Sequence, residues 1–74
     1  MLAIVKSSQD LASRIESRIH SRTHGRVRDL QVELAEQTVV LRGRAPTYYA
    51  KQLAQHGALE VSDGQPVVNA IDVE

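Results

Sequence analysis

The fold of this chain is decided by residues 30–43, which read Leu30-Gln31-Val32-Glu33-Leu34-Ala35-Glu36-Gln37-Thr38-Val39-Val40-Leu41-Arg42-Gly43. Apolar and polar residues alternate on both sides of Glu36-Gln37, and a period of two is typical of a strand with one buried face. The stretch therefore predicts a β-hairpin with Glu36-Gln37 as its turn. Gly43, at the end of the second strand, indicates a bulge or the close approach of a helix.

A helix is predicted before the hairpin. Ser7 and Asp10 suit its start, because a hydroxyl can cap a free amide and an acidic side chain favours the first turn. An apolar stripe with a spacing of four residues follows, formed by Leu11, Ile15 and Ile19. Gly25 should lie just beyond the end of this helix, because glycine adopts a positive φ at little cost.

A second helix and a third strand are predicted after the hairpin. The helix opens at Pro46-Thr47, either with proline in its first turn or with threonine as its cap. Its inward face is rich in small residues at helical spacing, namely Ala50, Leu53, Ala54, Gly57, Ala58 and Val61. Asp63-Gly64 should end this helix. The alternating strand that follows should point four side chains inward: Val67, Asn69, Ile71 and Val73.

Together these elements predict an α+β domain in the order α-β-β-α-β, with two helices packed on one face of a three-stranded sheet. We expect a single domain over residues 8–74, and the sequence leaves the structure of residues 1–7 open. The right-handed crossover rule makes the third strand parallel to the second if they share a sheet, but does not say which strand it neighbours. The other sheet face stays open, with Gln31, Glu33, Ala35, Thr38, Val40, Arg42, Val68, Ala70 and Asp72 on it.

The composition is that of a small domain with an aliphatic core. The 74 residues include no Cys, Phe or Trp, so neither a disulfide nor a cysteine-based metal site is expected. Residues 1–44 carry eight basic and five acidic residues (+3), and residues 45–74 carry one basic and four acidic (−3). No apolar run approaches the roughly 18 residues of a membrane span, and Leu2-Ala3-Ile4-Val5 is too short for a signal-peptide core. As written, the chain lacks an export or membrane-spanning segment, which would place it in the cytoplasm, but the sequence leaves its compartment open.

The order and spacing of the elements resemble the BON domain (bacterial OsmY and nodulation) over residues 8–74. The resemblance rests on three stretches: Val39-Val40-Leu41-Arg42-Gly43, Ala50-Lys51-Gln52-Leu53-Ala54 and Val67-Val68-Asn69-Ala70-Ile71-Asp72-Val73. Two positions depart from the family, since Gln37 replaces the usual turn glycine and Gly64-Gln65 replaces a frequent Gly-Val pair. The resemblance implies a non-catalytic bacterial binding module, linked to phospholipid interaction, envelope maintenance and osmotic stress.

Three arginines are the candidates for binding phospholipid or another phosphate. Arg14, Arg18 and Arg22 recur every four residues, so they share one helix edge beside the apolar stripe. Guanidinium groups bind phosphate well, and a basic edge beside an apolar stripe is typical of helices that meet anionic lipid. The plainer interpretation is a solvated helix flank with a few surface ion pairs.

Five apolar or aromatic residues outside the predicted core are candidates for an interaction surface: Tyr48, Tyr49, Leu59, Val40 and Val68. Tyr48 and Leu59 should point away from the inward helix face, and Tyr49 should lie on its border. Val40 and Val68 belong to the open sheet face. Pairing that face with a second copy would add burial to a small core, whereas a solvated face is the alternative.

No cofactor, metal site or enzymatic activity is predicted. His20 and His24 could share a metal ion, but no third ligand stands at a recognisable spacing. Asn69 should satisfy backbone groups of a loop or a helix end. The sequence contains no nucleophile motif and no glycine-rich phosphate loop.

Three functions therefore stand as hypotheses. The first is binding to anionic phospholipid surfaces, and the second is protein interaction or self-association. Nucleic-acid binding is the weakest, because the net charge is zero and the sheet offers no aromatic side chains on which bases could stack.

Overall fold

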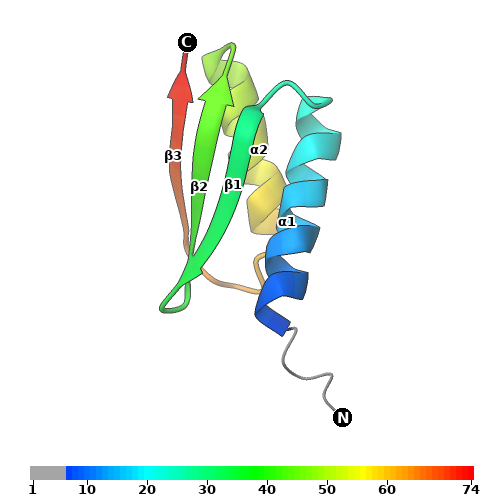
Figure 1. The fold of residues 1–74 in the computed structure, drawn as a ribbon, viewed down its shortest axis with the longest axis vertical. Coiled ribbons are helices and arrows are strands. Elements are labelled where there is room, and N and C mark those ends of the chain that lie inside the picture. The colour runs from blue at the N-terminus through cyan, green and yellow to red at the C-terminus, as the bar shows by residue number, and fades with distance from the viewer. Residues whose placement is uncertain (1–6) are drawn as a thin grey trace.

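A computed structural model describes the backbone of residues 7–74 and the side chains from Asp10 onward. Five elements follow one another: α1 (Ser7–Thr23), β1 (Arg28–Ala35), β2 (Thr38–Ala45), α2 (Tyr48–Glu60) and β3 (Val67–Val73). This order confirms the predicted α-β-β-α-β arrangement (Figure 1). Residues 1–6 and the expected capping side chain of Ser7 lie outside the described part of the chain. Neither helix of residues 7–74 has the length and apolar character to cross a membrane.

The predicted apolar stripe holds α1 against the sheet. Ile15 and Ile19 are fully buried and Leu11 nearly so. The helix ends at Thr23 because His24 (φ 55°) and Gly25 (φ 71°) both take the left-handed conformation. The amide of Gly25 then donates to the carbonyl of His20 at 2.9 Å, which satisfies one of the free carbonyls at the helix end.

The hairpin turn lies at the predicted residues. Ala35 pairs with Thr38, and the two residues between them, Glu36 (φ 43°) and Gln37 (φ 67°), both have positive φ. Two left-handed residues are what a tight two-residue hairpin requires, because such a turn matches the twist of its strands. This requirement explains why glycine is favoured at the position that Gln37 occupies here.

Gly43 accommodates a bulge in β1. Arg28 pairs with Arg44 and Gln31 with Arg42, so two residues of β1 lie opposite Gly43 alone. A Cβ atom on Gly43 would lie 2.9 Å from the carbonyl oxygen of Arg28. Of the two interpretations offered for this glycine, the bulge is therefore confirmed.

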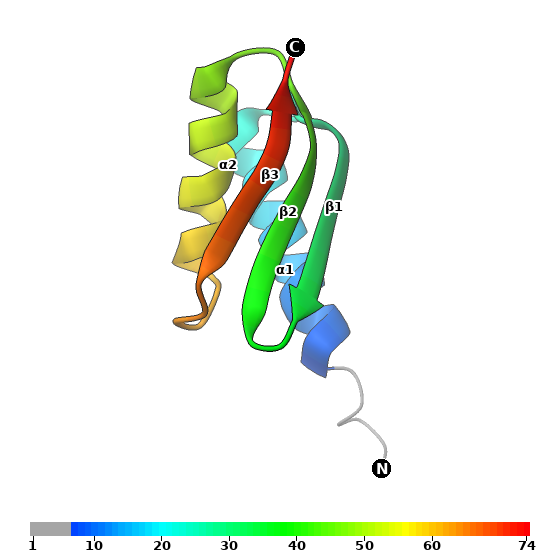
Figure 2. The same cartoon turned by 90° about the vertical axis from the view of Figure 1, so that its left-hand side faces the viewer.

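The sheet has the order β1-β2-β3, with β1 antiparallel and β3 parallel to β2. The predicted parallel pairing is confirmed, and the neighbour of β3, which the crossover rule left open, is the central strand. Both helices cover the same face of the sheet (Figure 2). The opposite face is open, as expected.

Thr47 caps α2. Its hydroxyl accepts a hydrogen bond from the amide of Ala50 at 3.1 Å, which selects threonine over proline as the signal that starts the helix. The inward face of α2 is built from small residues, with Ala50, Ala54, Gly57 and Ala58 buried. The helix ends at Glu60 and does not run to Asp63-Gly64 as predicted, because Val61 leaves the helical conformation at φ −125° and ψ 17°.

The core is aliphatic and lies between the helices and the sheet. Its buried members are Leu11, Ile15, Ile19, Val39, Leu41, Ala45, Ala50, Ala54, Ala58 and Ile71. The expected burial of Val73 was wrong, because this side chain is 44% exposed although its register partner Ala45 is buried. Val73 is the last residue of a strand with a neighbour on one side only, so little of the structure covers it.

Candidate functional site

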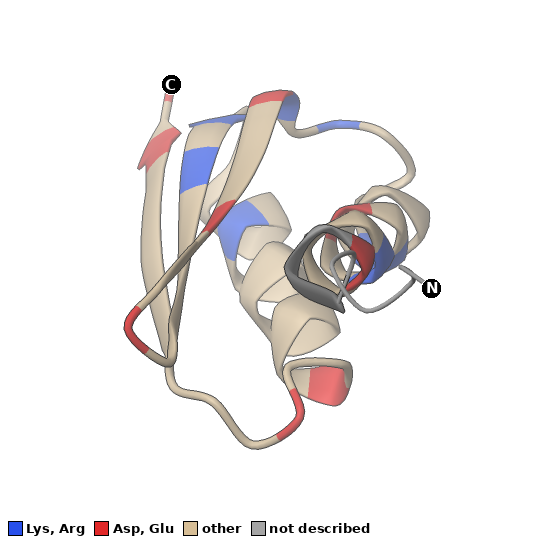
Figure 3. Ribbon diagram, turned by 60° about the horizontal axis from the view of Figure 1, so that its bottom comes forward, with Lys and Arg blue, Asp and Glu red and all other residues tan. Residues whose placement is uncertain are grey.

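The predicted arginine row lies along the contact between the two helices. Arg18 donates to Glu60 Oε1 at 3.2 Å, and Arg22 forms hydrogen bonds with both carboxylate oxygens of Glu60. Arg14 lies 3.7 Å from the carboxylate of Asp63. Figure 3 shows these acidic positions in red at the end of α2 and in the segment that follows it. The basic first half of the sequence thus meets the acidic second half here, with three arginines facing two carboxylates.

Gly57 allows this contact to be close. A Cβ atom on Gly57 would lie 3.3 Å from Cγ of Arg22 and 3.4 Å from Cγ of Arg18, so the arginine stems pack over the glycine. The side chains of Arg14, Arg18 and Arg22 nevertheless stay 61%, 47% and 46% exposed. Ion pairs this exposed are weak, and another anion can compete for the guanidinium groups.

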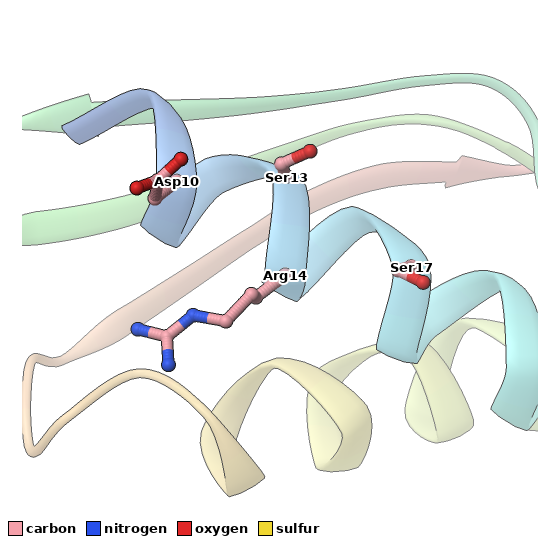
Figure 4. Close-up of a pocket in the computed structure, with 4 residues that line it drawn as sticks. All are labelled: Asp10, Ser13, Arg14 and Ser17. Carbon is pink, nitrogen blue, oxygen red and sulfur yellow. The ribbon is translucent and has the colours of Figure 1, made fainter. Parts of the chain in front are cut away.

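The surface along α1 beyond this contact is an open groove lined by Asp10, Ser13, Arg14 and Ser17. Figure 4 shows the Arg14 side chain leaving α1 toward the segment between α2 and β3. Among the side chains that the structure describes there, Arg14 is the one cation, and Asp63 already pairs with it.

A smaller cavity of about 200 Å³ lies where the end of α1 meets the start of α2. We call it the basic cavity. The described residues that line it include no Asp or Glu: they are Arg22, Thr23, His24, Arg26, Thr47, Tyr49, Ala50 and Leu53. Arg26 forms no ion pair with any residue in the described part of the chain. The structure thus brings Arg22 and Tyr49, predicted as members of two separate sites, to one cavity.

Sequence reasoning missed Arg26 and weighed His24 only as a metal ligand. Arg26 continues the four-residue spacing of the arginine row, but it lies beyond Gly25, where the predicted helix has ended, so helical periodicity could not place it. The available signal was its position in the short connection after Gly25, because a loop residue beside a helix end is free to face a neighbouring element. Its closeness to Tyr49 depends on the docking of two helices.

The interaction-surface candidates are divided among separate places. Tyr48 and Tyr49 are 63% and 68% exposed at the start of α2, whereas Leu59 is 49% exposed near its other end. Tyr49, expected on the border of the inward face, is the more exposed of the two tyrosines. Val40 and Val68 are register partners on the open sheet face, but only Val68 is exposed, at 49%.

Asn69 has a structural role, as predicted, but its partners lie within α2 and β3 and not in a loop or at a helix end. It lies on the inward side of β3, and its Nδ2 atom donates to the carbonyl of Lys51 at 2.9 Å and to Oε1 of Gln55 at 3.4 Å. The amide therefore ties β3 to the first turns of α2. Across residues 7–74, no three His, Cys, Asp or Glu side chains gather closely enough to hold a metal ion.

The family model of the BON domain matches residues 7–74. No curated protein and no solved structure matches the chain.

Proposed function

Because the chain belongs to the BON domain family, whose members are non-catalytic binding modules, we propose that it binds anionic phospholipid surfaces through the basic cavity. The observation that carries this proposal is the lining of the cavity, whose described residues include Arg26 and His24, together with Arg22, which also pairs with Glu60, but no acidic residue.

Three polar side chains at the cavity, those of Arg26, His24 and Tyr49, suit contact with a lipid headgroup. The guanidinium of Arg26, which has no acidic partner in residues 7–74, can donate two parallel N–H groups to one phosphate. The ring of His24 offers a further N–H donor. Tyr49, 68% exposed at the same cavity, combines an apolar ring with a hydroxyl and so suits the boundary between headgroups and acyl chains.

The arginine row supports the proposal less strongly than the cavity does. Glu60 and Asp63 offset two of its three charges and would themselves be repelled by an anionic surface. We expect the row to add attraction only where lipid phosphate replaces a carboxylate as the partner of a guanidinium. The cavity should therefore contribute most of the affinity.

Co-sedimentation with lipid vesicles tests the proposal. The chain should bind vesicles that contain phosphatidylglycerol, should ignore vesicles of phosphatidylcholine alone, and should dissociate as salt is raised. Arg26→Gln should weaken binding about fivefold, since one arginine near an anionic surface is worth about 1 kcal/mol. Arg14→Gln is the matched control, because it removes the same charge from α1 at a position that Asp63 already neutralises.

Two results would overturn the proposal. Absence of binding to anionic vesicles at low salt would exclude phospholipid as the ligand. If Arg14→Gln lost as much binding as Arg26→Gln, binding would depend on the total positive charge of the chain and not on the cavity.

Self-association through the open sheet face is a second candidate. Val40 and Val68 lie side by side across β2 and β3, and Val68 is half exposed on a face that neither helix covers. A second copy on this face would bury both valines. Sedimentation equilibrium over a wide concentration range tests the candidate, and a strict monomer at the highest concentration would exclude it.

A further inference from the structure

The outer edge of β3 is a place where another strand could add to the sheet. β3 pairs with β2 on one side only (Figure 1). The strand is seven residues long, contains no proline, lysine or arginine, and carries Asp72 as its single charge. Regular edge strands with few charges are ready templates for pairing with another chain.

The pairing with β2 shows which backbone groups of β3 face outward. The carbonyl of Pro66 accepts from Val39, and the amide of Glu74 donates to Ala45, so the even-numbered positions bond toward β2. Along a strand in a parallel pair, successive residues direct their amide and carbonyl groups to opposite sides. The odd-numbered amides of β3 therefore point to the free edge, namely those of Val67, Asn69, Ile71 and Val73.

One of these outward amides already has a partner. The Oδ1 atom of Asn69 accepts a hydrogen bond from the amide of Ile71 at 3.2 Å. The same side chain is anchored through Nδ2 to the carbonyl of Lys51 in α2, so its orientation is held from the helix. An incoming strand would have to break this bond in the middle of the edge.

The opposite edge of the sheet is interrupted in another way. The bulge in β1 opposite Gly43 breaks the regular ladder, and Asp29 within it has a φ of 53°. Bulges of this kind twist an edge away from regular pairing. β3 has no bulge in its register with β2, so it needs a different protection.

We propose that Asn69 closes the free edge of β3 to strand addition by a second copy of this chain. The side chain occupies one of the two middle outward amides, that of Ile71, and so interrupts the row of donors along the strand. This role is distinct from the lipid binding proposed above and does not depend on it. It also concerns the edge of the sheet and not its open face.

Amide hydrogen exchange in the unmodified chain provides the first test. The amides of Asn69 and Ile71 both point outward, but only that of Ile71 is hydrogen-bonded to the Asn69 side chain. We expect the Ile71 amide to exchange about tenfold more slowly than the Asn69 amide, after correction for intrinsic rates. Equal rates at the two positions would overturn the proposal without any variant.

The variant Asn69→Val provides the second test. Valine suits a strand but cannot accept the Ile71 amide, so exchange at Ile71 should accelerate about tenfold in dilute solution. At high concentration the variant should self-associate, and the outward amides of Ile71 and Val73 should then become protected. A folded Asn69→Val chain that stays monomeric at all concentrations would overturn the proposal.

Gln55→Ala is the matched control. It removes one contact of Asn69 Nδ2 while leaving the bond from Ile71 to Oδ1 in place. This variant should remain monomeric, with an unchanged rate of exchange at Ile71. Association of the control to the same extent as Asn69→Val would show that loosening the Asn69 side chain, and not exposing the Ile71 amide, opens the edge, and would also overturn the proposal.

Discussion

The carboxylate of Glu60 accepts hydrogen bonds from Arg22, which lies 38 residues earlier in the chain, and so joins the end of α2 to α1. Arg18 uses the same carboxylate. The most basic feature of the sequence is therefore partly an internal contact between helices. The arginine row can bind an outside anion only where that anion replaces Glu60 or Asp63 as the partner of a guanidinium group.

Replacing Glu60 by Gln tests this competition. The free energy of unfolding in urea should fall by less than about 1 kcal/mol, because both ion pairs are substantially exposed. Binding to anionic vesicles should rise at low salt, since two guanidinium groups lose their competing carboxylate. A large loss of stability, or weaker vesicle binding, would contradict this view of the row.

Substitutions at Gly57 test the packing of the two helices. Gly57→Ala should leave stability within about 1 kcal/mol of the unmodified chain, because alanine favours the helix and the flexible arginine stems can move by a few tenths of an ångström. Gly57→Leu should destabilise by about 2 kcal/mol, because the helices would have to separate. Thermal or urea unfolding measures both. Equal stabilities for the two variants would show that the contact is loose.

Gly43 should be far less tolerant than Gly64. In Gly43→Ala the new Cβ would lie 2.9 Å from a backbone carbonyl that cannot move away without disturbing the bulge, so we expect a loss of about 2 kcal/mol or more. Gly64 also has a positive φ, but no atom lies within 4 Å of the added Cβ. Gly64→Ala should therefore cost only about 1 kcal/mol of conformational strain. Urea unfolding of the pair measures the difference, and similar losses would argue against the close approach.

The cap of α2 should contribute measurably to stability. Thr47→Ala removes the acceptor of the Ala50 amide and should lower the free energy of unfolding by about 1 kcal/mol. Thr47→Ser keeps the hydroxyl and should lose little of this contribution. If the serine variant were as unstable as the alanine variant, the methyl group of Thr47 and not its hydroxyl would be the source of the effect.

Local patterns were enough to predict the elements and most of the core. The alternation around Leu41 and the four-residue spacing of Ile15 and Ile19 report which face of a strand or helix is buried, because those periods are set by backbone geometry alone. The same reasoning failed at Val73. Periodicity assigns a side chain to a face but does not say where the covering elements stop.

Less of the candidate site could be predicted from local sequence patterns. Arg14, Arg18 and Arg22 were correctly placed on one edge, but their partners Glu60 and Asp63 lie at the end of α2 and in the segment after it. Arg26 follows Arg22 by four residues but lies beyond the end of α1, so helical periodicity does not place it, and its position at a cavity with Tyr49 arises only when α1 and α2 are docked.

The sequence by itself determined the order of the five elements, the hairpin turn and the aliphatic stripes, because each depends on residues close together in the chain. Only the tertiary structure decided that β3 lies beside β2. The same holds for the hydrogen bonds from Arg18 and Arg22 to Glu60, and for the bond from the Ile71 amide to the side chain of Asn69. The reason is physical. The parallel pairing requires α2 to connect β2 to β3, and the ion pairs require the two helices to approach each other at Gly57. Patterns among neighbouring residues carry no information about such contacts between distant parts of the chain.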